Sequence, residues 1–279
     1  MWRFALICVG LIGCGSSISA DEAASACVIF GSCMGDGIND CYTDAMPYWT
    51  TAEARCVLAA APDCTAVRAC FGMTLVADPS CTARTITCEG NNMVTCSDGV
   101  RSTISCPDAS LTLRVGTGAT CVMTSTGALC GDASCSAATA TCDGSVAKVC
   151  NTDKGVLLSV DCASYGQTCT RGACTSAGGG GTCATSTPAS CDGASIVRCS
   201  GGVELRTDCS ALVTGASCFP GSATNPEVYC GLGNACYPEK GAETCSGNAV
   251  GFCAGGTSST VDCTALGFTR CISGRCSAI

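Results

Sequence analysis

Apolar and polar residues alternate in short blocks over most of the chain, and these blocks recur. Beyond residue 80, runs rich in Val and Ile flank the dipeptides Asp98-Gly99, Gly201-Gly202 and Gly255-Gly256. Such dipeptides accept positive φ at both central positions of a type I′ turn. The pattern predicts β-hairpins, with strands near 92–97 and 100–106 in the first copy and at equivalent places later. A longer turn is expected in the second copy, which has Asp153-Lys154-Gly155 instead.

Cysteines divide this region into four copies of one six-cysteine unit. The first cysteines lie at positions 81, 135, 183 and 236, and seven residues always separate the second cysteine from the third. We expect one β-hairpin module per copy, with bounds at 77–131, 132–175, 183–231 and 232–279. Six cysteines can pair in many ways, so the spacing alone leaves the connectivity within each module open.

A glycine-rich segment, residues 176–182, separates the second module from the third. Its composition is typical of a flexible linker, which predicts two pairs of modules with a hinge near Gly178 to Gly181. The alternative is a surface loop within one continuous stack, because repeated units bury their faces on each other.

Residues 21–76 have a different pattern. Their runs are rich in Ala, a strong helix former, and Thr50 or Thr51 ahead of Glu53 is an N-cap signal. The gaps between their six cysteines are 5, 7, 14, 7 and 5 residues, an order that reads the same from either end. An antiparallel helical hairpin with nested disulfides needs such a palindrome. We therefore predict the pairs Cys27–Cys70, Cys33–Cys64 and Cys41–Cys56.

Residues 1–20 have the layout of an export signal. Arg3 supplies a positive charge and the apolar run Phe4 to Ile12 follows it. Leu11-Ile12-Gly13-Cys14 then resembles the lipobox of bacterial lipoproteins, which implies cleavage before Cys14 and acylation of its thiol. Several acyl chains would hold the protein on a membrane stably. The alternative is simple secretion with cleavage after Ala20.

Composition supports export. The chain has 32 cysteines and no histidine among 279 residues, a cysteine content typical of a disulfide scaffold made in an oxidising compartment. Removing Cys8 and Cys14 from the count leaves 30 cysteines, an even number that can pair completely. The formal charge is −8 and the few basic residues are scattered, which argues against nucleic acid as a partner.

The usual catalytic motifs are missing from the sequence. Without histidine there is no Ser-His-Asp or Cys-His arrangement, and without a Cys-x2-Cys pair we expect neither a metal site nor a thiol exchange site. Asp161, Asp208 and Asp262 occupy equivalent positions in successive modules, which is typical of residues that hydrogen-bond a turn. We predict a protein without enzymatic activity and without a cofactor.

Tyr42, Tyr48 and Trp49 form an aromatic cluster at the tip of the predicted helical hairpin. Tyr and Trp are enriched at binding hot spots, which makes these three residues candidates for a binding site. The alternative is that they plug the end of a small helical fold.

The repeats share Cys-(Asp/Glu/Ser)-Gly, a following Val/Ile strand and, in three units, an Asp-Cys pair. Over residues 81–276 this combination resembles the cysteine-rich tandem repeats of predicted secreted proteins and lipoproteins of myxobacteria and related bacteria. The resemblance implies a location outside the cytoplasm, either on the outer membrane or cell surface or in the medium.

These observations together predict a small disulfide-rich, mainly β fold: an N-terminal α-helical hairpin followed by four β-hairpin modules. The function we expect is that of an exported, lipid-anchored cell-surface protein with a non-enzymatic binding or structural role, directed at a protein or another cell-surface ligand. The alternative is a secreted hydrolase inhibitor that presents a disulfide-braced loop such as residues 219–229.

Overall fold

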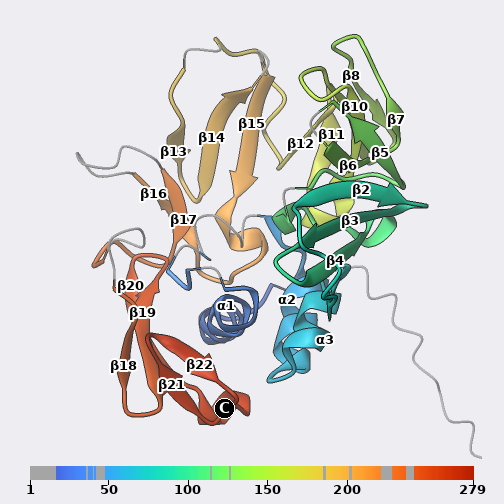
Figure 1. The fold of residues 1–279 in the computed structure, drawn as a ribbon. Helices are drawn as coiled ribbons and strands as arrows, with labels where there is room; N and C mark the ends of the chain where they lie inside the picture. Colours follow the sequence, from blue (N-terminus) through green and yellow to red (C-terminus); the bar gives the residue numbers. More distant parts are fainter. Residues whose placement is uncertain are drawn as a thin grey trace, which may run out of the picture.

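The computed structural model has the expected disulfide-rich, mainly β fold, with its helices gathered near the N-terminus (Figure 1). It describes residues 17–35, 37–39, 41, 48–113, 115–125, 127–184, 187–200, 203–220, 228–236 and 242–279. A helical unit (residues 17–72) precedes module 1 (73–131), module 2 (132–175), module 3 (176–231) and module 4 (232–279). The four modules form an arc around the helical unit.

Within the described residues, the helical unit has the two arms of the expected helical hairpin and a short third helix. Helix α1 (Ala20–Met34) begins with a capping box between Ser19 and Glu22, and helix α2 (Thr51–Ala60) begins with the predicted box between Thr50 and Glu53. Helix α3 (Cys64–Ala69) is capped by Asp63, whose carboxylate accepts hydrogen bonds from two backbone N–H groups. The interior of the unit is apolar and includes fully buried Ile29, Val57, Val67 and Phe71.

Two of the three nested disulfides predicted for this unit are wrong. Cys33 does bond to Cys64, but Cys27 bonds to Cys41 and Cys56 bonds to Cys70, so Cys27–Cys70 and Cys41–Cys56 do not form. The reason is that the helices are short and the chain reverses between them. Helix α1 stops at Gly35, which adopts a left-handed conformation with φ of 86°.

Each module is an antiparallel three-stranded meander followed by a short 3-10 turn and a two-stranded hairpin. Module 1 has β1 (Met73–Ala77), β2 (Thr85–Glu89), β3 (Asn92–Ser97), β4 (Val100–Ser105), β5 (Thr120–Thr124) and β6 (Gly127–Gly131). Module 2 has β7 (Ala133–Ser134), β8 (Ala140–Asp143), β9 (Val146–Asn151), β10 (Val156–Asp161), β11 (Thr168–Thr170) and β12 (Ala173–Thr175).

The last two modules repeat this plan. Module 3 has β13 (Ser190–Asp192), β14 (Ser195–Ser200), β15 (Val203–Asp208), β16 (Ser217–Phe219) and β17 (Tyr229–Gly231). Module 4 has β18 (Thr244–Ser246), β19 (Ala249–Ala254), β20 (Thr257–Asp262), β21 (Arg270–Ile272) and β22 (Arg275–Ser277). The strands predicted at 92–97 and 100–106 correspond to β3 and β4.

One disulfide pattern recurs in all four modules: the first cysteine bonds to the third, the second to the fifth and the fourth to the sixth. The first bond holds the segment that enters the module against the middle strand, and the other two attach the meander and the 3-10 turn to the terminal hairpin. The bonds are Cys81–Cys96, Cys88–Cys121 and Cys106–Cys130; Cys135–Cys150, Cys142–Cys169 and Cys162–Cys174; Cys183–Cys199, Cys191–Cys218 and Cys209–Cys230; and Cys236–Cys253, Cys245–Cys271 and Cys263–Cys276.

The predicted turns are confirmed where the structure describes them. Asp98 and Gly99 both have positive φ, 53° and 76°, as a type I′ turn requires. Gly255 and Gly256 do the same. Module 2 makes the expected longer turn, closed by hydrogen bonds from Lys154 and Gly155 to the carbonyl of Asn151. The dipeptide at 201–202 lies outside the described residues.

The recurring aspartates are turn residues, as the sequence analysis predicted. Asp161, Asp208 and Asp262 each accept a hydrogen bond from the backbone N–H two positions on, at distances of 3.1, 2.9 and 2.9 Å. Their carboxylates therefore hold the 3-10 turn that carries the fourth cysteine. Module 1 has Ser105 at this position, and its hydroxyl donates to Asp108 at 2.7 Å.

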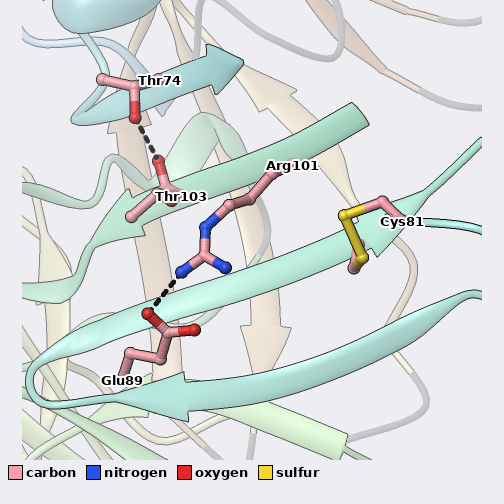
Figure 2. Close-up of polar contacts among 6 residues, drawn as sticks. Thr74, Cys81, Glu89, Arg101 and Thr103 are labelled. Carbon is pink, nitrogen blue, oxygen red and sulfur yellow. Dashed lines mark hydrogen bonds and ion pairs between the residues drawn. A yellow bond between two sulfur atoms is a disulfide. The ribbon is translucent and has the colours of Figure 1, made fainter. Parts of the chain in front are cut away.

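The acidic residue after the second cysteine forms an ion pair with a basic residue of the meander in three modules. Figure 2 shows this in module 1, where Arg101 of β4 reaches across β3 to Glu89 of β2. The same figure shows Thr74 of β1 donating a hydrogen bond to the carbonyl of Thr103. Asp143 pairs with Lys148 and Asp192 with Arg206. These pairs lie at the surface, where ion pairs contribute little to stability.

The segment that enters each module pairs with the outer edge of its meander. In module 1, β1 pairs with β4 over five residues, and in module 2, β7 pairs with β10. Backbone N–H groups of the segment 232–236 donate to the carbonyls of Gly255 and Gly256 in module 4. The modules are therefore joined by hydrogen-bonded edges, which places the boundary of module 1 at the start of β1.

The segment 176–182 is held in the same way, and in this it differs from the flexible linker we expected. The N–H of Gly180 donates to Glu204 at 2.8 Å, and the N–H of Glu204 donates to Gly181 at 2.9 Å. Thr175 Oγ1 also accepts the N–H of Arg206 at 2.9 Å. Modules 2 and 3 therefore pack along β15, as the continuous-stack alternative requires.

The helical unit shares one hydrophobic core with modules 3 and 4. Ile18 is 1% exposed, and its backbone exchanges two 2.8 Å hydrogen bonds with Leu212 and Thr214 of module 3. On the other side, the Asn39 side chain accepts the N–H of Cys253 at 2.7 Å, and the Ser32 hydroxyl accepts the N–H of Cys276 at 3.0 Å. These contacts position the modules around α1.

The packed segment 176–182 can be tested with Gly180→Ala. Gly180 has φ of 92°, and a Cβ there would lie 2.6 Å from Thr170 Cγ2, so we expect the free energy of unfolding to fall by roughly 1 to 3 kcal/mol. Guanidinium chloride unfolding with the disulfides intact measures this. The matched control is Gly181→Ala, which meets no atom within 4 Å and has no positive φ, and it should be neutral or slightly stabilising. Equal, small effects would indicate a free hinge.

Candidate functional site

A prominent hollow lies where modules 2 and 3 meet the helical unit. It consists of two adjoining cavities of about 730 and 500 Å³, both within the range typical of small-molecule sites. We call the two together the inter-module cleft. The residues that line both cavities, and so join them, are Tyr165, Gln167, Thr207 and Cys230.

Equivalent hairpin faces of modules 2 and 3 both line the larger cavity. In module 2, Ala147 and Val149 of β9 stand opposite Val160 and Leu158 of β10. Module 3 contributes the four residues at the same places in its own repeat. They are Ile196 and Arg198 of β14 and their partners Thr207 and Leu205 of β15.

Residues at the same places in the other two modules are partly covered. Met93 and Ile104 of module 1 are 5% and 4% exposed beneath the terminal hairpin of that module. Val250 and Phe252 of module 4 are 0% and 5% exposed within the core shared with the helices. Val149, in contrast, remains 38% exposed. Modules 2 and 3 therefore leave the part of this face around Val149 and Arg198 open to solvent, whereas Ala147 and Leu205 beside it are 4% and 9% exposed.

Arg198 gives the larger cavity its charge. Among the described residues that line this cavity, Arg198 is the one with a charged side chain. It is exposed, and within the described part of the chain it has no carboxylate partner. The corresponding residue of module 2 is Val149. The cavity is thus an apolar space with a single free cation, in a chain whose acidic residues outnumber the basic ones by 22 to 14.

The smaller cavity lies against the N-terminus of α2 and is bounded by Thr50 to Ala52 and by Leu212 to Ala216. Trp49 also lines it, and its buried Nε1–H has no hydrogen-bond acceptor among the described residues. Asp208 faces this cavity too, but its carboxylate caps the turn at Ser210. The polar groups here are largely committed to the fold.

Tyr165 stands between the two cavities and is half-buried. Burial raises the pKa of its phenol, and the negative charges of Glu53 and Asp161 raise it further. The hydroxyl therefore stays neutral at ordinary pH. A neutral phenol offers a ligand both a hydrogen-bond donor and an acceptor.

Asp161 is perturbed in the opposite direction. Hydrogen bonds from the Ser145 hydroxyl and from the backbone N–H of Ala163 lower the pKa of this carboxyl. The group is almost fully exposed, and its bonds are those of the turn, so we assign it a structural role.

The three aromatic residues singled out in the sequence have different positions. Trp49 is 2% exposed and packs edge-on against Phe30 at 5.2 Å and close to Phe71 at 5.4 Å, so it plugs the helical unit as the alternative proposed. Tyr48 is half-buried and lines the larger cavity. Tyr42 lies outside the described residues, as does Cys14.

Sequence reasoning missed the cleft itself. It singled out neither Tyr165 nor Arg198, because neither belongs to a motif that recurs in every module. Alignment of the modules could have found Arg198, since it places a cation where module 2 has Val149 and modules 1 and 4 have Thr95 and Phe252.

Searches of family models, curated proteins and solved structures give no match to the chain. In the part of the chain that the structure describes, no three His, Cys, Asp or Glu side chains are arranged to hold a metal ion. None of the described helices has the length and apolarity needed to cross a membrane.

The raised pKa of Tyr165 predicts that one phenol of the folded protein titrates later than an ordinary tyrosine, whose pKa is 10.0. Because the fold favours the neutral phenol, the stability it contributes is present below that pH and falls as the pH rises above it. A rapid alkaline titration followed by tyrosinate absorbance measures the effect. Tyr165→Phe should remove one late-titrating group. If it removes an ordinary one, Tyr165 is not desolvated in the cleft.

Proposed function

We propose that this chain is an exported, lipid-anchored cell-surface protein that acts as a non-enzymatic binding module. The fifteen disulfides are those of a protein that folds in an oxidising compartment outside the cytoplasm. The resemblance to cysteine-rich repeats of secreted proteins and lipoproteins points to the same location. A binding role would also account for the inter-module cleft.

The observation that carries the binding role is the pair of open hairpin faces on modules 2 and 3. Module 4 buries Phe252 at the position where modules 2 and 3 expose Val149 and Arg198, so this opening belongs to the cleft. Disulfides fix both walls, because Cys142–Cys169 and Cys191–Cys218 join each meander to its terminal hairpin. A preformed apolar site loses little entropy on binding.

Residues 17–20 support the lipid anchor at Cys14. Cleavage after Ala20 would remove Ser19, which caps α1, and buried Ile18, which pairs with module 3. Loss of a helix N-cap costs about 1 kcal/mol, and loss of a buried Ile side chain costs about 2 to 5 kcal/mol. Cleavage before Cys14 keeps both residues and leaves the acylated cysteine three residues from Ser17. We therefore favour the lipobox over simple secretion.

Hydrolase inhibition is a second candidate, because the base of the 219–229 loop is braced. Phe219 and Tyr229 pair across β16 and β17 and stack at 5.8 Å. Their neighbours Cys218 and Cys230 are bonded to different parts of module 3, Cys191 and Cys209. Residues 221–227 lie outside the described residues, so the loop supports this candidate only through its base.

The mature protein purified from exporting cells tests the proposed function. We expect its intact mass to be that of a chain beginning at an acylated Cys14, and Cys14→Ser to release the protein from the membrane fraction. On arrays of cell-surface molecules, glycans and small ligands, the wild type should bind a ligand that Val149→Trp loses, because the indole would occupy the apolar surface that the ligand contacts.

Stoichiometric inhibition in a panel of proteases, unchanged by Val149→Trp, would favour the inhibitor instead. Turnover of any substrate by the purified protein would contradict a non-enzymatic role. A mature chain beginning at Asp21 would contradict the anchor.

A further inference from the structure

The wall of the larger cavity formed by module 3 combines apolar side chains with one guanidinium. Ile196 and Arg198 alternate along β14 and so lie on the same face of the meander, next to Leu205 and Thr207 of β15. Leu205 is 9% exposed, whereas Arg198 is exposed. The apolar side chains therefore form the floor, and the cation stands where the cavity meets solvent.

The part of the lining that module 2 contributes has no charge to neutralise this cation. Ala147, Val149, Leu158 and Val160 are all apolar, and no carboxylate is found among the described residues around the cavity. An unpaired arginine at an apolar site is a receptor for an anion, because guanidinium binds a carboxylate through two parallel hydrogen bonds.

From this geometry we propose that the inter-module cleft binds an amphiphilic monocarboxylate, with its aliphatic body between the hairpin faces of modules 2 and 3 and its carboxylate on Arg198. This inference rests on the proposed binding function and specifies its ligand. The apolar body would be held by burial, at about 25 cal/mol per Å² of apolar surface removed from water. The carboxylate would set the orientation.

The single cation selects among anions. A phosphate or a polyanionic glycan carries more charge than one guanidinium neutralises, and the net charge of −8 repels polyanions from the molecule. A fully polar anion would leave the apolar walls exposed. The cavity volume of about 730 Å³ accommodates a small amphiphile, and the half-buried hydroxyls of Tyr48 and Tyr165 lie on the same lining.

The smaller cavity suits this ligand less well. Asp208 and the Thr50–Glu53 capping box line or adjoin it, so a carboxylate there would face groups of its own charge. The unpartnered Trp49 Nε1–H is a neutral donor and is 2% exposed. We therefore place the acidic end of the ligand in the larger cavity.

Isothermal titration calorimetry of the full mature protein with decanoate and decan-1-ol, both below their aggregation limits, tests the proposal. The two probes have the same chain length and differ in the head group. Charge-assisted hydrogen bonds to Arg198 should make decanoate bind roughly tenfold or more tightly than decan-1-ol. Arg198→Gln should abolish this difference while the alcohol binds as before.

Two further variants complete the design. Arg84→Gln removes an exposed arginine of module 1 that does not line the cleft, and it should leave both affinities unchanged. Val149→Trp should abolish binding of both probes. Circular dichroism and the intact oxidised mass confirm that each variant is folded.

The outcomes separate the ligand class from the binding function. If both probes bind equally and Val149→Trp abolishes both, the carboxylate assignment is overturned and the cleft remains a binding site. If neither probe binds, the inference is overturned, and the array experiment alone decides the proposed function. Equal losses in Arg198→Gln and Arg84→Gln would show a general charge effect and would also overturn it.

Discussion

Five times along this chain, the first of six cysteines bonds to the third, the second to the fifth and the fourth to the sixth. The pattern holds in four β modules and also in the helical unit, where Cys27–Cys41, Cys33–Cys64 and Cys56–Cys70 follow the same order. Aromatic side chains make only 5% of the sequence, so small units of this composition need covalent staples to be stable. A disulfide typically contributes roughly 2 to 4 kcal/mol by restricting the unfolded chain.

Because the disulfides stabilise each module, its surface residues can differ from those of the other modules. Each module has the same disulfide pattern, but its hairpin face packs against its own terminal hairpin in module 1 and into the core shared with the helical unit in module 4. In modules 2 and 3 the equivalent faces line one cavity. Because the edges of consecutive modules are hydrogen-bonded, the opening between these faces is fixed by the backbone. Repetition thus supplies the frame, and the departures from repetition supply the candidate site.

Local chemistry explains which features the sequence predicted. Strands β3 and β4 were found because Asp98-Gly99 can adopt only a few turns, and the capping role of Asp161 followed from its place before a cysteine. The nested helical disulfides were wrong because a palindrome of gaps cannot decide the pairing. When the cysteines are numbered from the C-terminus instead, the bond from the first to the third cysteine becomes the bond from the fourth to the sixth, and the bond from the second to the fifth is unchanged. The observed pairing is therefore as symmetric as the nested pairing, and the palindrome of gaps fits both.

Tertiary contacts explain the remaining differences. The glycines of residues 176–182 are typical of a flexible linker. Here they serve packing instead, because Thr175 and Thr170 lie against Gly179 and Gly180 and leave no room for a side chain. Arg198 belongs to no motif. Its position in the cavity depends on where module 2 lies relative to module 3, which the sequence does not predict. The cysteine content predicts a disulfide scaffold and an oxidising compartment. The candidate site, in contrast, depends on how two modules are arranged in space, which composition does not predict.

Disulfide mapping tests the central claim most directly: the native protein is digested without reduction, and the linked peptides are identified by mass spectrometry. The account predicts Cys27 linked to Cys41, Cys56 linked to Cys70, and the pairing of first with third, second with fifth and fourth with sixth cysteines in every module. A Cys27–Cys70 link, or modules with different connectivities, would contradict it.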